Sequence, residues 1–204
     1  MAAIPAHRAE QVARWYEIDG MSMADIAKKL DVSLNAVTYF MRKHGIVRRS
    51  ASAAGKQLFE NTPVTFSKNK LITEELRLLH SQGVMLYWAE GYKTSKANGV
   101  DFANSDPDMV RLFVKYLRKT YVLDENRLRA YVYCYEDQNI EELEKFWSKV
   151  TEIPVSQFTK AHVRKKFSVN SRIMQHGLVH VRYADKKLLK DIMDDIEMFR
   201  DLDS

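Results

Sequence analysis

The sequence predicts an α+β protein. A small all-helical domain over residues 1–46 is followed by a larger domain of the αββα type over residues 70–204, with helices packed on a curved antiparallel sheet. Before residue 46, apolar residues recur at helical spacing in three short segments. Beyond residue 70, long helical patterns alternate with short segments in which every second residue is apolar. The stretch between them, residues 47–69, is polar, basic and rich in small residues, and is expected to be a linker.

The N-terminal domain is expected to contain three short helices. The first covers residues 5–19 and the second residues 22–30, each with one apolar stripe. Ser33 is placed to cap a third helix that ends before Gly45, because its hydroxyl can accept from the free amides of the first turn. Small Ala27 lies where the second and third helices should cross. Two helices joined by a three-residue turn form the helix-turn-helix layout.

The segment MSMADIAKKLDVSLNAVTYFMRKHGI closely resembles the helix-turn-helix of many bacterial regulators, recombinases and nucleases. In that motif the second helix enters the major groove while the first braces across the backbone. The side chains expected to project toward DNA are Leu34, Asn35, Thr38, Tyr39 and Arg42. Asn35 is the best candidate for a base contact, because an Asn amide pairs bidentately with adenine. The alternative is a three-helix unit that serves protein contacts.

Two arginines at the start of the expected linker, Arg48 and Arg49, are candidates for tracking phosphates or entering a minor groove. The alternative is a solvated tether with incidental charge. The charge of the whole chain favours a polyanionic partner, because the sequence has 32 Lys and Arg residues and 27 Asp and Glu residues, for a net charge of +5.

The composition also bounds the class of protein. The single cysteine, Cys134, excludes an internal disulfide and a Cys-rich zinc site. The sequence shows no signal peptide and no apolar run of spanning length, so no membrane partner is expected. The expected location is cytoplasmic and nucleoid-associated, in a prokaryotic or phage-type setting.

The larger domain begins with an expected helix over residues 72–90, which contains Gly83. A glycine inside a helix costs about 1 kcal/mol relative to alanine, and close approach of another helix is the usual reason for it. Two extended segments, residues 92–96 and 100–104, are expected to form a hairpin. Further helices are expected from Pro107, over residues 140–150 and over residues 187–199.

The clearest strand covers residues 127–136, where apolar and polar side chains alternate. Its apolar face must pack on helices, whereas its other face consists of arginine and tyrosine. Two further strands are expected over residues 158–166 and 178–183. The side chains expected to contact DNA from these strands are Arg127, Arg129, Tyr131, Tyr133, Lys160, His162, Arg164, Lys166, His180 and Arg182. The alternative is an ordinary solvated sheet face.

The segment GVMLYWAEG, Gly83 to Gly91, resembles the nine-residue LAGLIDADG motif. An expected hairpin, a helix that starts at NSDP and a basic strand follow it, as in LAGLIDADG homing endonucleases and their single-motif relatives. The resemblance extends from about Leu71 to the C-terminus. Met85 replaces the tight-packing glycine of the motif, and Trp88 replaces its first acidic residue.

The resemblance implies that Glu90, in the penultimate acidic position, is a metal ligand and catalytic residue, with Lys93 beside it. Because the chain has one such helix, it implies a homodimer formed through helix 72–90 on a near-palindromic site in double-stranded DNA. The implied cofactor is Mg²⁺ or Mn²⁺, and the implied activity is site-specific DNA cleavage by phosphodiester hydrolysis. Two alternatives stay open, a non-cleaving transcriptional regulator that retains this fold and, more distantly, a site-specific recombinase.

Overall fold

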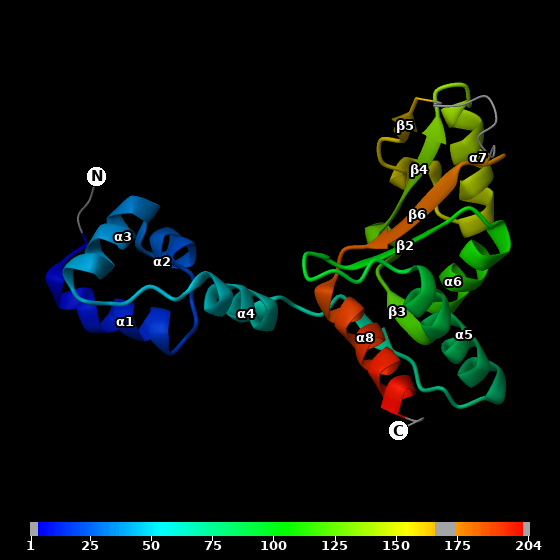
Figure 1. Ribbon diagram of the computed structural model, residues 1–204. Coiled ribbons are helices and arrows are strands. Elements are labelled where there is room, and N and C mark those ends of the chain that lie inside the picture. The colour runs from blue at the N-terminus through cyan, green and yellow to red at the C-terminus, as the bar shows by residue number, and fades with distance from the viewer. Residues whose placement is uncertain (1–3, 166–173, 202–204) are drawn as a thin grey trace. The chain divides into compact units, whose positions relative to one another are not determined.

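The computed structural model describes residues 4–165 and 174–201. The chain divides into two compact units, Met1–Pro63 and Val64–Ser204 (Figure 1). The stretch expected to be a linker contains a helix, α4 (Ala51–Asn61), whose first turn is capped by the Ser50 hydroxyl. Alanine favours helix, and a serine directly before it supplies the cap, so the small residues of this stretch form a helix instead of an extended tether.

The first unit has the expected helix-turn-helix. A short 3-10 turn, η1 (Ala6–Arg8), leads into α1 (Ala9–Glu17), α2 (Met23–Leu30) and α3 (Leu34–Lys43). Ser22 and Asp25 form a reciprocal capping box at the start of α2, and Ser33 caps α3 as expected. The tight turn between these two helices is made by Asp31, which adopts a left-handed backbone with φ of 53°.

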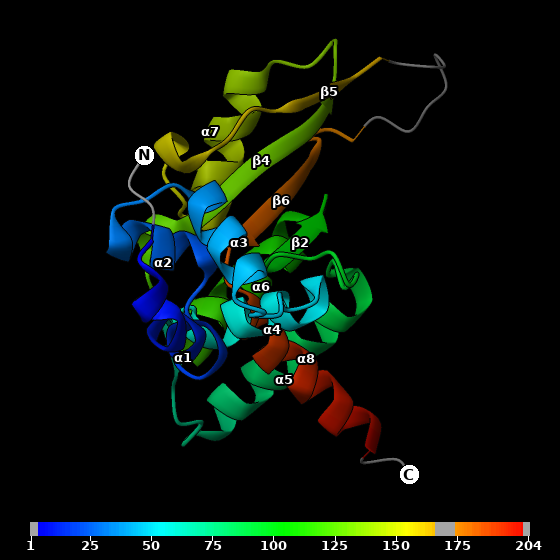
Figure 2. The same cartoon turned by 90° about the vertical axis from the view of Figure 1, so that its left-hand side faces the viewer.

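The second unit has two layers. Its helices are α5 (Glu74–Glu90), α6 (Pro107–Thr120), α7 (Ile140–Thr151) and α8 (Lys186–Asp201). Helices α5, α6 and α7 lie on one side of a four-stranded sheet, and α8 packs beside α5 (Figures 1 and 2). No helix among the described residues is long and apolar enough to cross a membrane.

The sheet is mixed, which corrects the expectation of a purely antiparallel one. Its order is β2 (Val100–Asn104), β6 (Leu178–Tyr183), β4 (Leu128–Tyr135) and β5 (His162–Arg164). Strand β6 pairs antiparallel with both neighbours, whereas the edge strand β5 runs parallel to β4. A second, two-stranded sheet joins β1 (Phe66–Lys68) to β3 (Tyr121–Leu123), and the sequence pattern did not indicate it.

One expected strand is absent, and another is shorter than the sequence pattern predicts. Residues 92–96 form a loop, and the hairpin is reduced to one bridge between Gly91 and Phe102. Within residues 158–165, the described part of the next expected strand, the strand consists of β5, and Phe158 makes a separate bridge to Ala130. The preceding residues form a 3-10 turn, η3 (Val155–Gln157), which takes the chain to the edge of the sheet.

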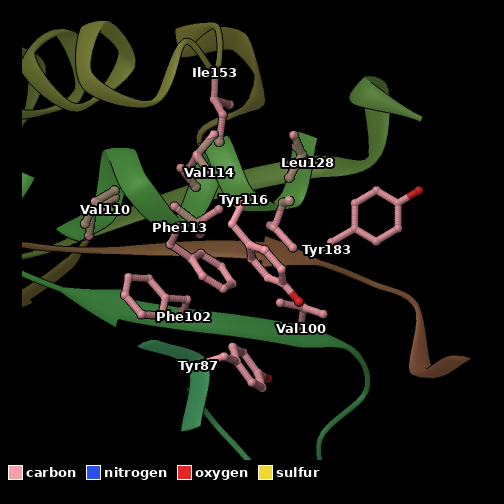
Figure 3. Packing of buried hydrophobic residues seen from close by; sticks show 14 of the residues in the cluster. Tyr87, Val100, Phe102, Val110, Phe113, Val114, Tyr116, Leu128, Ile153 and Tyr183 are labelled. Carbon is pink, nitrogen blue, oxygen red and sulfur yellow. The ribbon is translucent and has the colours of Figure 1, made fainter. Parts of the chain in front are cut away.

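Aromatic packing joins the sheet to the helices (Figure 3). Phe113 of α6 stacks on Phe102 of β2 at 4.2 Å between ring centroids, and also on Tyr87 of α5 at 5.7 Å. Gly83 permits the close approach of α5 and α6, because a Cβ there would lie 1.9 Å from Cγ of Tyr116. The close helix approach expected at this glycine is therefore a contact within one chain.

Candidate nucleic-acid interface

The exposed face of α3 carries the side chains that the helix-turn-helix layout predicts. Leu34 and Tyr39 are 48% and 58% exposed, large fractions for apolar side chains in a folded unit. Asn35 and Arg42 are exposed too, and the Arg42 guanidinium lies 5.6 Å from the centre of the Tyr39 ring. Opposite them, Val37, Phe40 and Met41 are buried. One side of α3 is thus fixed in the core, while the other presents an amide, a phenol and a guanidinium.

Thr38 contributes less than expected to this face. Its side chain is half-buried, and its hydroxyl donates 2.9 Å to the backbone carbonyl of Leu34. The same hydroxyl lies 3.9 Å from the sulfur of Met23 in α2. Because these contacts occupy the hydroxyl, Thr38 contributes mainly to the packing of α2 on α3.

Arg49 does not project from the molecule, in contrast to the expectation that it contacts DNA. Its guanidinium donates to the backbone carbonyl of Tyr16, in the last turn of α1, and to those of Gly20 and Met21, which follow that helix. It also lies 4.0 Å from the centre of the Tyr16 ring, and the Tyr16 hydroxyl accepts from its backbone amide. A guanidinium satisfies the unpaired carbonyls of a helix end and suits the negative end of the helix dipole. Arg49 therefore holds the chain against α1, while Arg48 remains exposed.

Replacing Arg49 with alanine is expected to destabilise the first unit by about 1.5–3 kcal/mol, the range for hydrogen bonds to a charged group. The matched control is Arg48→Ala, which removes an exposed neighbour of the same type. The free energy of unfolding should be measured by urea titration of both variants without DNA. Equal stability of the two variants would show that the contacts of Arg49 do not stabilise this unit.

One face of the four-stranded sheet is not covered by the helices of the second unit. On β4, Leu128, Ala130, Val132 and Cys134 are buried, whereas Arg129, Tyr131, Tyr133 and Tyr135 point to the other side. The register places His180 and Arg182 of β6 beside Tyr131 and Arg129. It also places His162 and Arg164 of β5 beside Tyr133 and Tyr135. We call this set, with Asp101 and Ala103 of β2, the open face.

The rings of the open face stack on one another across the strands. Tyr131 and His180 lie 4.2 Å apart with an angle of 12° between their planes. Tyr133 and His162 lie 5.5 Å apart at 14°. Arg164 covers Tyr133 at 4.8 Å from the ring centre. Since cross-strand rings can stack in this way only when they stand upright on the sheet, their edges point outward.

Burial raises the pKa of the Tyr131 hydroxyl above its ordinary value, and the Asp101 carboxylate raises it further, while Arg182 opposes the rise. The phenol therefore stays protonated through the neutral range. It keeps an O–H donor for a ligand that lies against the open face.

Three of the expected contact residues lie off the open face or outside the described residues. Arg127 belongs to a 3-10 turn, η2 (Glu125–Arg127), and not to the strand. Its guanidinium donates 2.6 Å to the carbonyl of Ala184 and lies 5.7 Å from the Tyr183 ring, where its buried Nε has no partner in the described part of the chain. Lys160 is exposed in the loop before β5. Lys166 lies outside the described residues.

Glu90 ends α5 and is exposed. It borders a depression with a volume of about 370 Å³, which is also lined by Asp101, Tyr131 and His180 of the open face. Among the described residues, no three His, Cys, Asp or Glu side chains cluster closely enough to hold a metal ion. Of the two carboxylates that line this depression, Asp101 is paired with His180 and Arg182, whereas Glu90 has no hydrogen bond or ion pair among the described residues.

Lys93 turns back onto the end of α5. Its ammonium donates 2.6 Å to the carbonyl of Gly91 and lies 3.3 Å from that of Tyr87. Burial lowers the pKa of Lys93, and the charge of nearby Glu90 partly offsets this. The ammonium thus compensates the negative end of the helix, where Glu90 alone would be unfavourable. This role differs from the catalytic one that the family resemblance implies.

The sequence pattern places Asp101 on a strand face near the motif, as an alternative metal ligand to Glu90, but it does not predict the partners that Asp101 has in the structure. Its carboxylate bonds Nδ1 of His180 at 2.8 Å and lies 3.3 Å from Nε of Arg182. These partners are about eighty residues away in sequence. The contact depends on the pairing of β2 with β6, which alternation within one strand does not predict.

The chain matches no protein-family model, and no curated protein or solved structure shows significant similarity to it.

Proposed function

We propose that this chain binds double-stranded DNA at specific sites, and that each of its two units supplies one contact surface. The observation that carries the proposal is the open face, where arginine, histidine and tyrosine side chains stand together on the side of the sheet that the helices of the second unit do not cover. The exposed side of α3, in a helix-turn-helix, supports the proposal independently. Bases are read by such hydrogen-bonding groups, and phosphates are bound by arginine.

The stacked rings favour a duplex over a single strand as the ligand. Proteins bind single strands by stacking bases on exposed aromatic faces. On the open face, Tyr131 and His180 cover each other, as do Tyr133 and His162. The outward groups are therefore ring edges with a hydroxyl or a ring nitrogen. Such edges suit the base edges displayed in a groove.

Changes in α3 test the contribution of the first unit. Asn35→Ala and Arg42→Ala should each weaken binding to a preferred duplex by about 1–3 kcal/mol, because each removes a group expected to contact a base. Arg14→Ala, an exposed arginine of α1, is the control and should have little effect. Dissociation constants can be measured by fluorescence anisotropy. If both α3 variants keep the affinity and the sequence preference of the wild type, α3 does not take part in DNA recognition.

The reaction that we propose for this DNA-binding protein is metal-dependent phosphodiester hydrolysis by a homodimer. The proposal follows the resemblance to the LAGLIDADG motif, and it is supported by Glu90 at the rim of the open face. Mg²⁺ takes one or two carboxylates together with water and phosphate oxygens. The described residues of one chain form no cluster of three His, Cys, Asp or Glu side chains, and in the proposed homodimer the second chain brings its own Glu90.

A non-cleaving DNA-binding regulator is the second candidate. The observation that favours it is the position of Lys93, whose ammonium is engaged by carbonyls at the end of α5. A lysine held in this way is a poor partner for the charge that develops on a phosphate during hydrolysis. Binding by α3 and the open face is common to both candidates.

An exposed apolar stripe on α5 supports the proposed homodimer. Leu78 and Met85, two turns apart, are 59% and 51% exposed; Ala89 continues the stripe one turn later, and the polar Gln82 lies between Leu78 and Met85. Spacings of four, three and four residues place these side chains along one seam, as in paired helices. Gly83 faces the other way, toward Tyr116 of its own chain. The seam, and not the glycine, is the proposed contact between chains.

Met85→Asp is therefore expected to give a monomer, because each dimer would bury two carboxylates in its seam. Met198→Asp in α8 is a matched control, since Met198 is 50% exposed and lies outside the seam. Sedimentation equilibrium should give twice the 23.8 kDa of the chain for the wild type and for Met198→Asp. A wild-type monomer, free and on DNA, would contradict the homodimer.

A further inference from the structure

Arg182 is an exposed arginine of the open face and lies on an inner strand of the sheet. It lies on β6, the strand between β2 and β4, and is paired in register with Asp101 on one side and Arg129 on the other. Its side chain is 52% exposed, so the guanidinium can reach a ligand without any change in the sheet.

The direction of the Arg182 side chain is set by its neighbours. Its Nε lies 3.3 Å from one carboxylate oxygen of Asp101, and the other oxygen bonds His180 Nδ1 at 2.8 Å. The Asp101 side chain is 16% exposed and so has little freedom of its own. The Arg182 guanidinium also lies 6.0 Å from the centre of the Tyr131 ring. The ion pair with Asp101 keeps the guanidinium beside that carboxylate, and the two terminal nitrogens make no hydrogen bond among the described residues, so both are free to donate, as a fork, to a ligand.

We infer that Arg182 reads a guanine in the DNA site, with Asp101 as its positioning residue. Guanine presents two adjacent acceptors, O6 and N7, in the major groove, and the two terminal nitrogens of an arginine match them. Because the carboxylate already holds the side chain in one direction, less conformational entropy is lost when the fork binds. This inference rests on the proposed DNA-binding function and adds the base that one residue recognises.

Arg129, the neighbour of Arg182 on β4, differs in one decisive respect. Its guanidinium donates to the carbonyls of Asn126 and Leu128 at 2.5 and 2.8 Å, and it has no carboxylate partner among the described residues. It is bent back along its own strand instead of being supported from the neighbouring one. Arg129 is thus suited to phosphate, which any positive charge can contact, and it serves as the matched control for Arg182.

The experiment begins with parallel selections from a randomised duplex pool, using the full chain and the variants Arg182→Ala, Arg182→Lys, Asp101→Ala and Arg129→Ala. The wild type should enrich a site with one guanine position that both Arg182 variants no longer select. Arg182→Lys is included because an ammonium keeps the charge but cannot form the fork. Arg129→Ala should weaken binding to all duplexes and keep the same preferred site.

Base analogues at that position then test individual atoms. Replacing the guanine with 7-deazaguanine removes the N7 acceptor and should weaken wild-type binding about tenfold, within the range for a bidentate contact. Inosine keeps both O6 and N7 and should bind as guanine does. Arg182→Ala should bind all three bases alike. Asp101→Ala should lose most of its sensitivity to 7-deazaguanine without weaker binding to a scrambled duplex, an outcome that general damage to the sheet would not produce.

A preference for guanine at that position that survives Arg182→Ala would overturn the assignment, as would equal wild-type binding to guanine and 7-deazaguanine. Either result would leave the proposed function intact, because a preferred site would still exist. If the wild type enriches no site at all, the proposed function itself fails. Circular dichroism of each variant establishes that the fold is retained.

Discussion

Gly83→Ala is expected to destabilise the second unit by about 3 kcal/mol or more, at the upper end of the range for overpacking a core. The added Cβ would lie 1.9 Å from Cγ of Tyr116, and that ring is fully buried and cannot swing into solvent. Either α5 or α6 must move, which would disturb the contacts of α5 with β2. The better helix propensity of alanine, about 1 kcal/mol, offsets only part of this cost.

Gly55→Ala is the matched control for Gly83→Ala. Gly55 also lies inside a helix, α4, but a Cβ there would meet nothing within 4 Å. This variant should be neutral or more stable by up to about 1 kcal/mol. Urea unfolding followed by circular dichroism should therefore show a lower free energy of unfolding for Gly83→Ala and an unchanged or higher one for Gly55→Ala. Equal stability of both would mean that α5 and α6 do not approach each other closely at Gly83.

Glu90→Gln is expected to abolish Mg²⁺-dependent cleavage of a preferred site while duplex binding is retained. The change keeps the shape of the side chain and removes only its charge, which is the part that a cation requires. Removing a carboxylate beside phosphates could also raise affinity slightly in the absence of metal. The control is Glu75→Gln, which neutralises an exposed glutamate in the first turn of the same helix.

The cleavage assay requires a library of duplexes, because failure on one arbitrary plasmid would show only that the site is missing. Wild-type cleavage that persists in Glu90→Gln would refute the assignment of this residue. A wild type that binds its site but cuts nothing with Mg²⁺ or Mn²⁺ would favour the regulator instead. In that case Glu90→Gln should behave as the wild type does in both the cleavage and the binding assays.

Local sequence patterns predicted most of the helices, although not α4. Ser33 was expected to cap α3, and its hydroxyl accepts the backbone amide of Ala36. The helix expected from Pro107 begins there, and Asp106 accepts two backbone amides at its first turn. The alternation in β4 placed its buried and outward side chains correctly from Leu128 onward. These features depend on residues within one or two turns, which is why the sequence reveals them.

Features that depend on distant pairing were missed. The parallel pairing of β5 with β4 and the β1–β3 sheet join segments that lie far apart in the chain. Arg127 continued the alternation of β4, yet it belongs to a turn, because the strand begins one residue later. Arg49 lies in a basic tract and was expected to contact DNA, but its guanidinium binds the backbone carbonyls of Gly20 and Met21, which lie about thirty residues earlier in the chain. The role of Asp101 likewise depends on strand register.

Recognition of specific duplex sites is tested most directly by the dissociation constants of the full chain for its selected duplex and for a scrambled duplex, measured between 50 and 200 mM salt. We expect the selected duplex to bind about a thousandfold or more tightly, as site-specific proteins do. We also expect both affinities to fall steeply with salt, since the arginines of the open face displace counterions from phosphates. Equal affinity for the two duplexes at every salt concentration would contradict site-specific recognition, and the absence of binding to either at about 50 mM salt would contradict DNA binding altogether.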